Sequence, residues 1–373
     1  MFTFKEIYQA YLKCRKRKRN TINALKFEYD LIDNICNLET SLNNKTYTPK
    51  RSVCFLTTSP KLREVFAADF SDRVIHHLIV PILEQIYEPL FIYDSYSCRQ
   101  NKGIHYAVNR VKKFSKSSKY YLQLDIKNFF YSIDKRILFN MLNKQLVKDY
   151  EKKVKNTTIT LNEMLWIVYI LIFHDPIKQV IVKDVKNQIQ NIPSHKTLFK
   201  VNKKKALPIG NLTSQFFANV YMNGFDNFCK RELKCKKYLR YVDDFIILAD
   251  TKAELLEKKD KIELYLNDNL KLKIRDNFIL KKVNNGIDFL GYIVRQKYTL
   301  TRKRVINNFK FKKAKYLEKY ESLDGKMSLE EIKGFLSVLA SFHGHIKHSN
   351  SYNLKNKVGV IDDQKYIDSL FNK

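Results

Sequence analysis

The sequence predicts an α+β fold in which helices back a small antiparallel sheet. Residues 237–250 are two runs of β-branched and aromatic residues on either side of Asp243-Asp244, which is the pattern of a β-hairpin. Residues 120–125 form a second apolar strand, and a helical pattern begins shortly after it at Lys135. We therefore expect one sheet that carries carboxylates from two neighbouring strands.

The acidic pair Asp243-Asp244 is unusual inside an apolar hairpin. Acidic residues are depleted in strands, so a bare pair flanked by aromatic and aliphatic residues indicates a compensating cation. Carboxylate oxygens are hard ligands of the kind that suits Mg²⁺. For the pair taken alone, the alternative is an exposed turn in which each Asp bonds the local backbone.

Asp125 supplies a third carboxylate at the end of the strand 120–125. An aromatic pair follows, and Ser132 or Asp134 would cap the helix that begins at Lys135. Three carboxylates from two neighbouring strands can converge. Two-metal phosphoryl transfer requires such a set, because its paired ions, about 3.5–4 Å apart, hold the attacking and leaving oxygens in line.

A single Asp after an apolar strand, followed 118 residues later by a Tyr-Val-Asp-Asp hairpin, resembles the reverse transcriptases. Asp125 matches the first palm motif of that family, and Asp243-Asp244 match its Tyr-x-Asp-Asp motif. The resemblance covers roughly residues 55–350. It implies a right-hand polymerase with fingers, a palm of antiparallel strands and a helical thumb. It also implies an RNA-directed DNA polymerase with two Mg²⁺ ions, or Mn²⁺ as an alternative, held by Asp125, Asp243, Asp244 and the carbonyl of Ile126.

The composition agrees with a nucleic-acid enzyme. The chain has 373 residues, and its 45% hydrophobic content is enough for a core. Sixty-nine Lys and Arg against 38 Asp and Glu give a net charge of +31, spread along the whole chain, which favours nucleic acid over a membrane surface as partner. Six scattered cysteines indicate reduced thiols and a cytoplasmic location. We expect no targeting segment, because residues 1–6 offer no apolar core for a signal peptide, and no membrane span, because the longest apolar run, 164–173, is too short to cross a bilayer.

The first part of the chain is basic. We divide the protein into an N-terminal basic helical extension (1–60), fingers and palm (61–300) and a helical thumb (301–373). Lys61 and Arg63 alternate on an expected strand. The resemblance implies that these two residues and Arg73 hold the triphosphate of the incoming nucleotide. An ordinary basic surface strand is the alternative.

The segment 207–215 distinguishes among relatives. Pro208 and Gly210 predict a tight turn into a helix that Asn211 or Thr213 can cap. Most reverse transcriptases read Gln-Gly here, whereas this chain reads Ile209-Gly210. That departure resembles the reverse transcriptases of diversity-generating retroelements and related bacterial enzymes of antiviral defence.

The resemblance adds further nucleotide and primer contacts. Phe130 matches the ring under the incoming sugar, where it would exclude a 2′-hydroxyl, with a core Phe as the alternative. Ile209 and Gly210 would complete the dNTP site, and Ile209 would hold the base pair without a hydrogen bond. The expected primer and template contacts are Arg99, Gly103, Tyr241, Phe289, Leu290, Gly291 and Tyr292.

The expected reaction is cDNA synthesis from template RNA and dNTPs, error-prone in a diversity-generating retroelement. That class implies a nearby RNA partner and a small basic accessory protein. One alternative is an antiviral enzyme that copies a dedicated noncoding RNA. Another, of a different class, is an RNA-binding palm module without catalysis, against which the presence of all three carboxylates counts.

Overall fold

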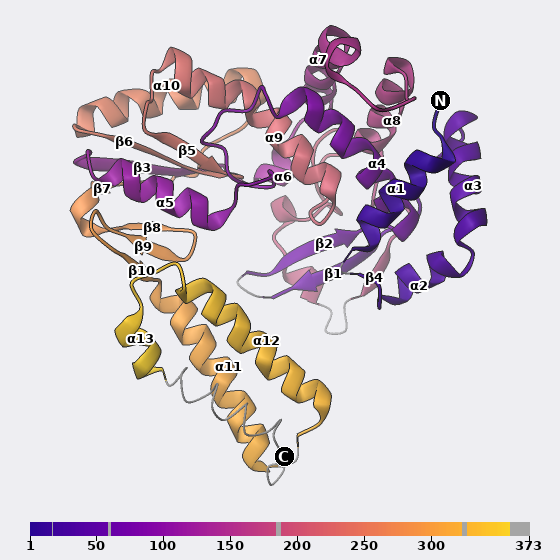
Figure 1. The fold of residues 1–373 in the computed structure, drawn as a ribbon. Helices are drawn as coiled ribbons and strands as arrows, with labels where there is room; N and C mark the ends of the chain where they lie inside the picture. Colours follow the sequence, from indigo (N-terminus) through magenta and orange to yellow (C-terminus); the bar gives the residue numbers. More distant parts are fainter. Residues whose placement is uncertain (17, 59–60, 184–187, 323–326, 359–373) are drawn as a thin grey trace.

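The computed structural model describes residues 1–16, 18–58, 61–183, 188–322 and 327–358. The palm sheet, the fingers and a projecting helical thumb occupy different corners of Figure 1. Parts of all three predicted domains lie outside the described residues: 17 and 59–60 of the extension, 184–187 of the fingers and palm, and 323–326 and 359–373 of the thumb.

The palm is a four-stranded antiparallel sheet in the order β5-β6-β3-β7. Its strands are β3 (Tyr120–Asp125), β5 (Tyr238–Tyr241), β6 (Asp244–Ala249) and β7 (Ile279–Lys282). Helices cover both faces: α10 (Lys252–Leu270) packs on β3 and β6, and α5 (Ile104–Ser115) packs on β5 from the other side (Figure 1). The predicted antiparallel sheet backed by helices is confirmed.

The fingers contain a smaller sheet in the order β2-β1-β4. Its strands are β1 (Val53–Thr57), β2 (Arg63–Ala67) and β4 (Ile181–Lys183), and β4 runs parallel to β1. The predicted boundary at residue 60 falls between two strands that pair along their whole length. The alternation predicted that Lys61 and Arg63 lie on one strand. Strand β2 begins at Arg63, so Lys61 lies just before it.

The remaining helices of the fingers and palm pack around α4 and α9. Helices α1 and α2 pack on α4, α3 packs on α1 and α2, and α7 packs on α4, α8 and α9. Their bounds are α1 (Phe4–Arg15), α2 (Ile22–Tyr29), α3 (Leu31–Asn43), α4 (Phe70–Tyr87), α6 (Phe129–Ser132), α7 (Lys135–Lys153), α8 (Leu161–Phe173) and α9 (Leu212–Asn227). Asp134 caps α7, since its side chain accepts hydrogen bonds from the backbone N–H groups of Arg136 and Ile137. Among the described residues, no helix is both long and apolar enough to cross a membrane.

The thumb joins the palm through a third sheet, β8 (Ile287–Phe289), β9 (Tyr292–Val294) and β10 (Thr299–Thr301). It continues as α11 (Lys303–Ser322), α12 (Leu329–Ile346) and α13 (Tyr352–Lys357). The Phe309 and Phe342 rings of α11 and α12 stack with centroids 3.9 Å apart.

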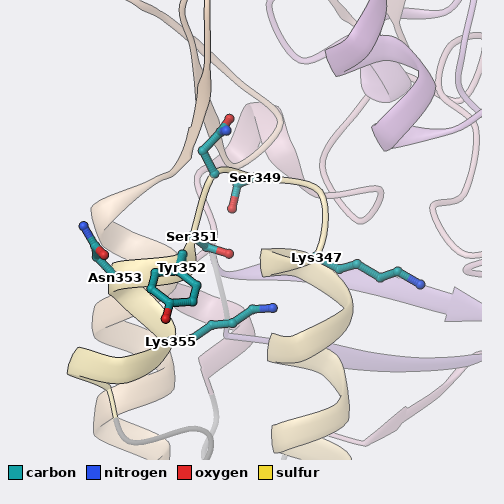
Figure 2. Close-up of a pocket in the computed structure, with 7 residues that line it drawn as sticks. Lys347, Ser349, Ser351, Tyr352, Asn353 and Lys355 are labelled. Atoms are coloured by element: carbon teal, nitrogen blue, oxygen red, sulfur yellow. The ribbon is translucent and has the colours of Figure 1, made fainter.

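The segment that follows α12 is hydrogen-bonded to the third sheet. The Asn350 N–H donates to the Thr299 carbonyl (2.7 Å), and the Thr299 N–H donates to Asn350 Oδ1 (3.0 Å). Figure 2 shows the open hollow beside this junction, where Lys347 and Lys355 extend from its rim. Ser351 Oγ donates to a helix carbonyl, so its hydroxyl is engaged within the thumb. The hollow therefore belongs to the attachment of the thumb.

A loop from residue 207 to 211 ties the palm to the fingers. The Leu207 N–H donates to the Phe130 carbonyl (2.8 Å), and the Phe66 N–H donates to the Ile209 carbonyl (2.8 Å). Gly210 follows Ile209 directly and has φ +119°, and a Cβ there would lie 2.7 Å from Val65 Cγ1 and 2.9 Å from the Phe66 carbonyl oxygen. Only glycine fits both the backbone conformation and this close approach.

We therefore expect Gly210→Ala to lower the free energy of unfolding more than Gly103→Ala does. Both glycines have φ near +120°, but a Cβ at Gly103 would meet no atom within 4 Å. The difference isolates the steric contact, for which overpacking costs about 1–3 kcal/mol. Chemical denaturation of the two variants measures it. Equal destabilisation would show that Gly210 matters only for its backbone angle.

Candidate active site

The three predicted carboxylates lie at one edge of the palm sheet. Asp125 ends β3 and is the register partner of Asp244, which begins β6. Side chains in such opposed positions have Cβ atoms about 4.5–5.5 Å apart. Asp243 lies in the turn before β6, and its carbonyl accepts a hydrogen bond from the Ile126 N–H (3.2 Å). The structure thus brings Asp125, Ile126, Asp243 and Asp244 together.

The turn that carries Asp243 is strained. Tyr241 pairs with Asp244, so Val242 and Asp243 alone connect the two strands. Two-residue hairpin turns favour positive φ and therefore usually contain Gly, Asn or Asp. Val242 instead has φ +57°, a conformation that is rare for a β-branched residue. Backbone strain of this kind persists only where the surroundings hold the residue in place.

The carboxylates carry unbalanced negative charge. Burial, then the charge of Asp243, raises the pKa of Asp125 to about 6. Burial is also the main cause that raises the pKa of Asp244 to about 7, and it raises the pKa of Asp243. Arg275 Nη1 lies 3.0 Å from Asp125 Oδ2, and Gln123 Nε2 donates to both oxygens of Asp244 (3.1 and 3.2 Å).

These properties fit a divalent cation. Asp125 Oδ1 is buried and accepts no hydrogen bond in the described part of the chain. Within that part, no three Asp, Glu, His or Cys side chains already form a metal-like cluster, and Asp125 and Asp244 are engaged by Arg275 and Gln123. The donor set nevertheless consists of hard oxygens at neighbouring backbone positions. Mg²⁺ or Mn²⁺ suits such a set and would offset the negative charge that burial makes unfavourable.

Basic residues of the fingers face this acidic edge. The charges of Lys61 and Arg63 act on Asp125 and Asp243, and they lower the pKa of both carboxyls against the effect of burial. Both basic side chains are exposed. Arg73 lies deeper, and its Nε donates to the Ala68 carbonyl (2.8 Å).

Arg73 and Gly210 border one hollow of about 330 Å³ between fingers and palm. Its other lining residues are Lys18, Phe55, Val65, Ala67, His76, His77, Asn211 and Leu212. Burial lowers the pKa of His76 to about 3 and that of His77 to about 4. The hollow therefore presents neutral imidazoles beside permanent positive charge.

The aromatic pair after β3 divides into one core ring and one accessible ring. Phe129 is buried at 2% exposure, whereas Phe130 is only partly buried, and their ring centroids lie 5.5 Å apart. Phe130 and Ile209 are linked through the loop after residue 206, because the Phe130 carbonyl accepts from Leu207. Ile209 is half-buried. The backbone of Phe130 is thus bonded to the loop that carries Ile209.

Two of the predicted primer and template residues, Arg99 and Gly103, lie at the segment before α5. Arg99 does not face outward: its guanidinium pairs with Glu88 (2.8 Å) and donates to the carbonyls of Ile92 and Ser95, and its side chain is 6% exposed. The prediction that Arg99 contacts nucleic acid is therefore not supported by its position. Gly103 is the N-cap of α5 and has open space around it.

In the segment 289–292, the two aromatic rings are buried and only the turn at Leu290 and Gly291 remains as a candidate contact for a primer. Phe289 and Tyr292 are buried in the core between α5 and the sheets, so their side chains are not available to a primer as the resemblance had implied. Leu290 and Gly291 form the turn, with φ +49° and +90°. Tyr241 is likewise half-buried against this core.

Sequence reasoning missed the polar residues that hold the acidic edge, namely Gln123, Arg240 and Arg275. Gln123 and Arg240 each interrupt an otherwise apolar or aromatic strand. A long polar side chain at a strand position expected to be buried was the available signal, because such a group needs a partner.

A palm sheet with an acidic edge between basic fingers and a helical thumb defines a right-hand nucleic-acid polymerase. The model of one protein family matches residues 48–294, and its description is "Reverse transcriptase (RNA-dependent DNA polymerase)". The chain belongs to this reverse transcriptase family.

Curated relatives agree with the family. The chain is 25% identical over 301 residues to the group II intron-encoded protein LtrA of Lactococcus lactis subsp. cremoris, covering 71% of this chain and 50% of LtrA. It is 21% identical to protein YkfC of Escherichia coli, covering 72% of each. The chain thus spans about half the length of LtrA. A solved structure of apo telomerase from Candida tropicalis is 14% identical, with a TM-score of 0.46 over 67% of this chain and 55% of the telomerase chain.

Proposed function

We propose that this protein is an RNA-directed DNA polymerase that copies an RNA template into cDNA. The observation that carries the proposal is the convergence of Asp125, Asp243 and Asp244 at one sheet edge opposite exposed basic residues of the fingers. The reaction is attack of a primer 3′-hydroxyl on the α-phosphate of a deoxynucleoside triphosphate. Family membership supports the same chemistry.

Each part of the site has a role in this proposal. Asp125, Asp243, Asp244 and the Ile126 carbonyl would hold two divalent ions, which when bound neutralise phosphate charge and align the reacting oxygens. Lys61 and Arg63 bind the triphosphate, because their charges already act on the acidic edge. Template RNA and the cDNA product bind mainly through their phosphates, in keeping with the net charge of +31.

Replacing one carboxylate tests the reaction directly. Asp243→Asn should abolish dNTP incorporation while RNA binding stays near native, because that binding comes from dispersed phosphate contacts. Asp250→Asn is the matched control: it makes the same change in an exposed residue just after the far end of β6. Primer extension and filter binding with the purified variants measure the two properties. Undiminished incorporation by Asp243→Asn would refute the proposed site and favour the hypothesis of an RNA-binding module.

Phe130 would select the sugar of the incoming nucleotide. Its accessible ring would clash with a 2′-hydroxyl, so Phe130→Ala should raise ribonucleotide incorporation relative to deoxynucleotide incorporation. Phe129→Leu is the control, since that ring is buried in the core and its truncation should affect stability alone. Steady-state incorporation of matched rNTP and dNTP pairs gives the ratio. If the ratio does not move in Phe130→Ala, Phe130 is only a packing residue.

For the biological role, we propose error-prone cDNA synthesis in a diversity-generating retroelement, with a nearby RNA and a small basic accessory protein as partners. The support is Ile209 in place of the usual glutamine, because isoleucine can pack against the nucleotide but offers no hydrogen bond. The second candidate is antiviral defence with a dedicated noncoding RNA as template. The same Ile209-Gly210 sequence is compatible with it.

Fidelity separates these two roles. Ile209→Gln should lower the error rate by a factor of about 2–10, the selectivity that one hydrogen bond of about 0.5–1.5 kcal/mol provides. Ile209→Leu keeps the packing without the hydrogen bond and serves as control. Sequencing of cDNA made on one RNA template measures the error spectra, with errors opposite template adenine expected for the retroelement class. Equal spectra would remove Ile209 from the argument, and an accurate native enzyme would favour defence.

A further inference from the structure

Arg240 lies beneath the strained turn and is almost completely enclosed. Its side chain is 1% exposed, and it pairs with Asp226, which is also buried. A guanidinium has five N–H donors. All five have acceptors here: Asp226 Oδ1 and Oδ2 (2.8 and 2.7 Å), Asn219 Oδ1 (3.3 Å), Ser95 Oγ (3.3 Å) and the Val242 carbonyl (2.9 Å).

These acceptors come from separate parts of the chain. Asp226 and Asn219 belong to α9, Ser95 belongs to the segment before α5, and Val242 is in the turn itself. The backbone of Arg240 is fixed as well, because its N–H donates to the Asp94 carbonyl (3.0 Å). The guanidinium therefore joins the turn that carries Asp243 to helix α9 through buried hydrogen bonds.

The bond to the Val242 carbonyl distinguishes this group from a buried ion pair that serves stability alone. Asp226 already neutralises the charge of Arg240, and a buried ion pair is by itself weak evidence for stability. The extra bond ends on the carbonyl of the one turn residue with φ +57°. A β-branched residue stays in that conformation only when neighbouring contacts hold it.

We propose that Arg240 is a positioning residue that holds the Val242-Asp243 turn in its strained conformation and so keeps Asp243 beside the Asp125–Asp244 pair. Arg240 touches neither substrate nor metal in this role, and it acts through the turn. The inference rests on the proposed function for the importance of Asp243, but the hold on the turn can be measured without activity.

The test separates turn positioning from folding by combining two substitutions. Arg240→Lys keeps the charge for Asp226, but a lysine ammonium has three donors and lacks the planar fork, so it cannot serve all five acceptors. Arg240→Lys should lower kcat by about 10- to 100-fold, as small misplacements of reacting groups do, with little change in the KM for dNTP. Val242→Gly in the Arg240→Lys background should restore much of the lost kcat, because glycine adopts positive φ without strain.

Arg110→Lys is the matched control. Arg110 also makes a two-bond pair with a buried carboxylate, Asp94 (2.7 and 3.3 Å), but it has no bond to the turn. This substitution should lower thermal stability and leave kcat near native, with no rescue by Val242→Gly. Recovery of kcat in the Arg240→Lys background without recovery of the melting temperature is the result that a purely structural Arg240 does not give.

Amide hydrogen exchange across residues 241–244 reads the turn directly. Arg240→Lys should speed exchange there relative to the rest of β5 and β6, and Val242→Gly should reverse part of that change. If Arg240→Lys fails to fold, Asp226→Asn provides the same comparison, because it weakens the hold on the guanidinium at constant side-chain volume. Unchanged turn exchange in the folded variant, or a loss of kcat that Val242→Gly does not alter, would overturn the proposal. A native protein without polymerase activity would refute the proposed function, while the exchange data would still decide the role of Arg240.

Discussion

The antiparallel pairing of β3 with β6 is the constraint on which the site depends. This register sets Asp125 opposite Asp244 and places Asp243 in the adjoining turn. Because side chains alternate along a strand, a slip of one residue would turn Asp125 to the other face and bury it in the core. The apolar residues of the two strands prevent the slip, since Leu122, Leu124, Phe245 and Ile247 are all fully buried in this register. The hydrophobic core therefore determines where the charges lie.

That position is electrostatically unfavourable for the protein alone. Burial and mutual repulsion raise the pKa values of Asp125 and Asp244. Positive groups near Asp125 and the Gln123 hydrogen bond to Asp244 offset only part of the effect. Arg275 and Gln123 engage two of the three carboxylates, while the buried Asp125 Oδ1 accepts no hydrogen bond from the described residues. Active sites commonly keep such an imbalance because binding a cation or a charged substrate relieves it. A bound cation would therefore stabilise this arrangement of carboxylates.

Sequence patterns predicted the parts of the fold that depend on local chemistry. The hairpin around Asp243, the strand ending in Asp125 and the helix capped by Asp134 each follow from a few neighbouring residues. Patterns were less informative where distant packing decides which way a side chain points. Arg99 and Tyr292 have the residue types of ligand contacts. The structure instead pairs Arg99 with Glu88 and buries Tyr292 against segments remote in the chain. Arg240 was missed for the same reason, because its partners on α9 and near Ser95 are not its sequence neighbours.

The loop at Ile209 shows how the fold separates position from chemistry. Main-chain bonds fix this loop, since the Ile209 carbonyl accepts from Phe66 and Gly210 packs directly against β2. These contacts do not involve the side chain of residue 209. A glutamine or an isoleucine can therefore occupy the position on the same backbone. Selection at this residue can act on nucleotide discrimination with little effect on the link between fingers and palm, whereas any side chain at Gly210 would disturb that link.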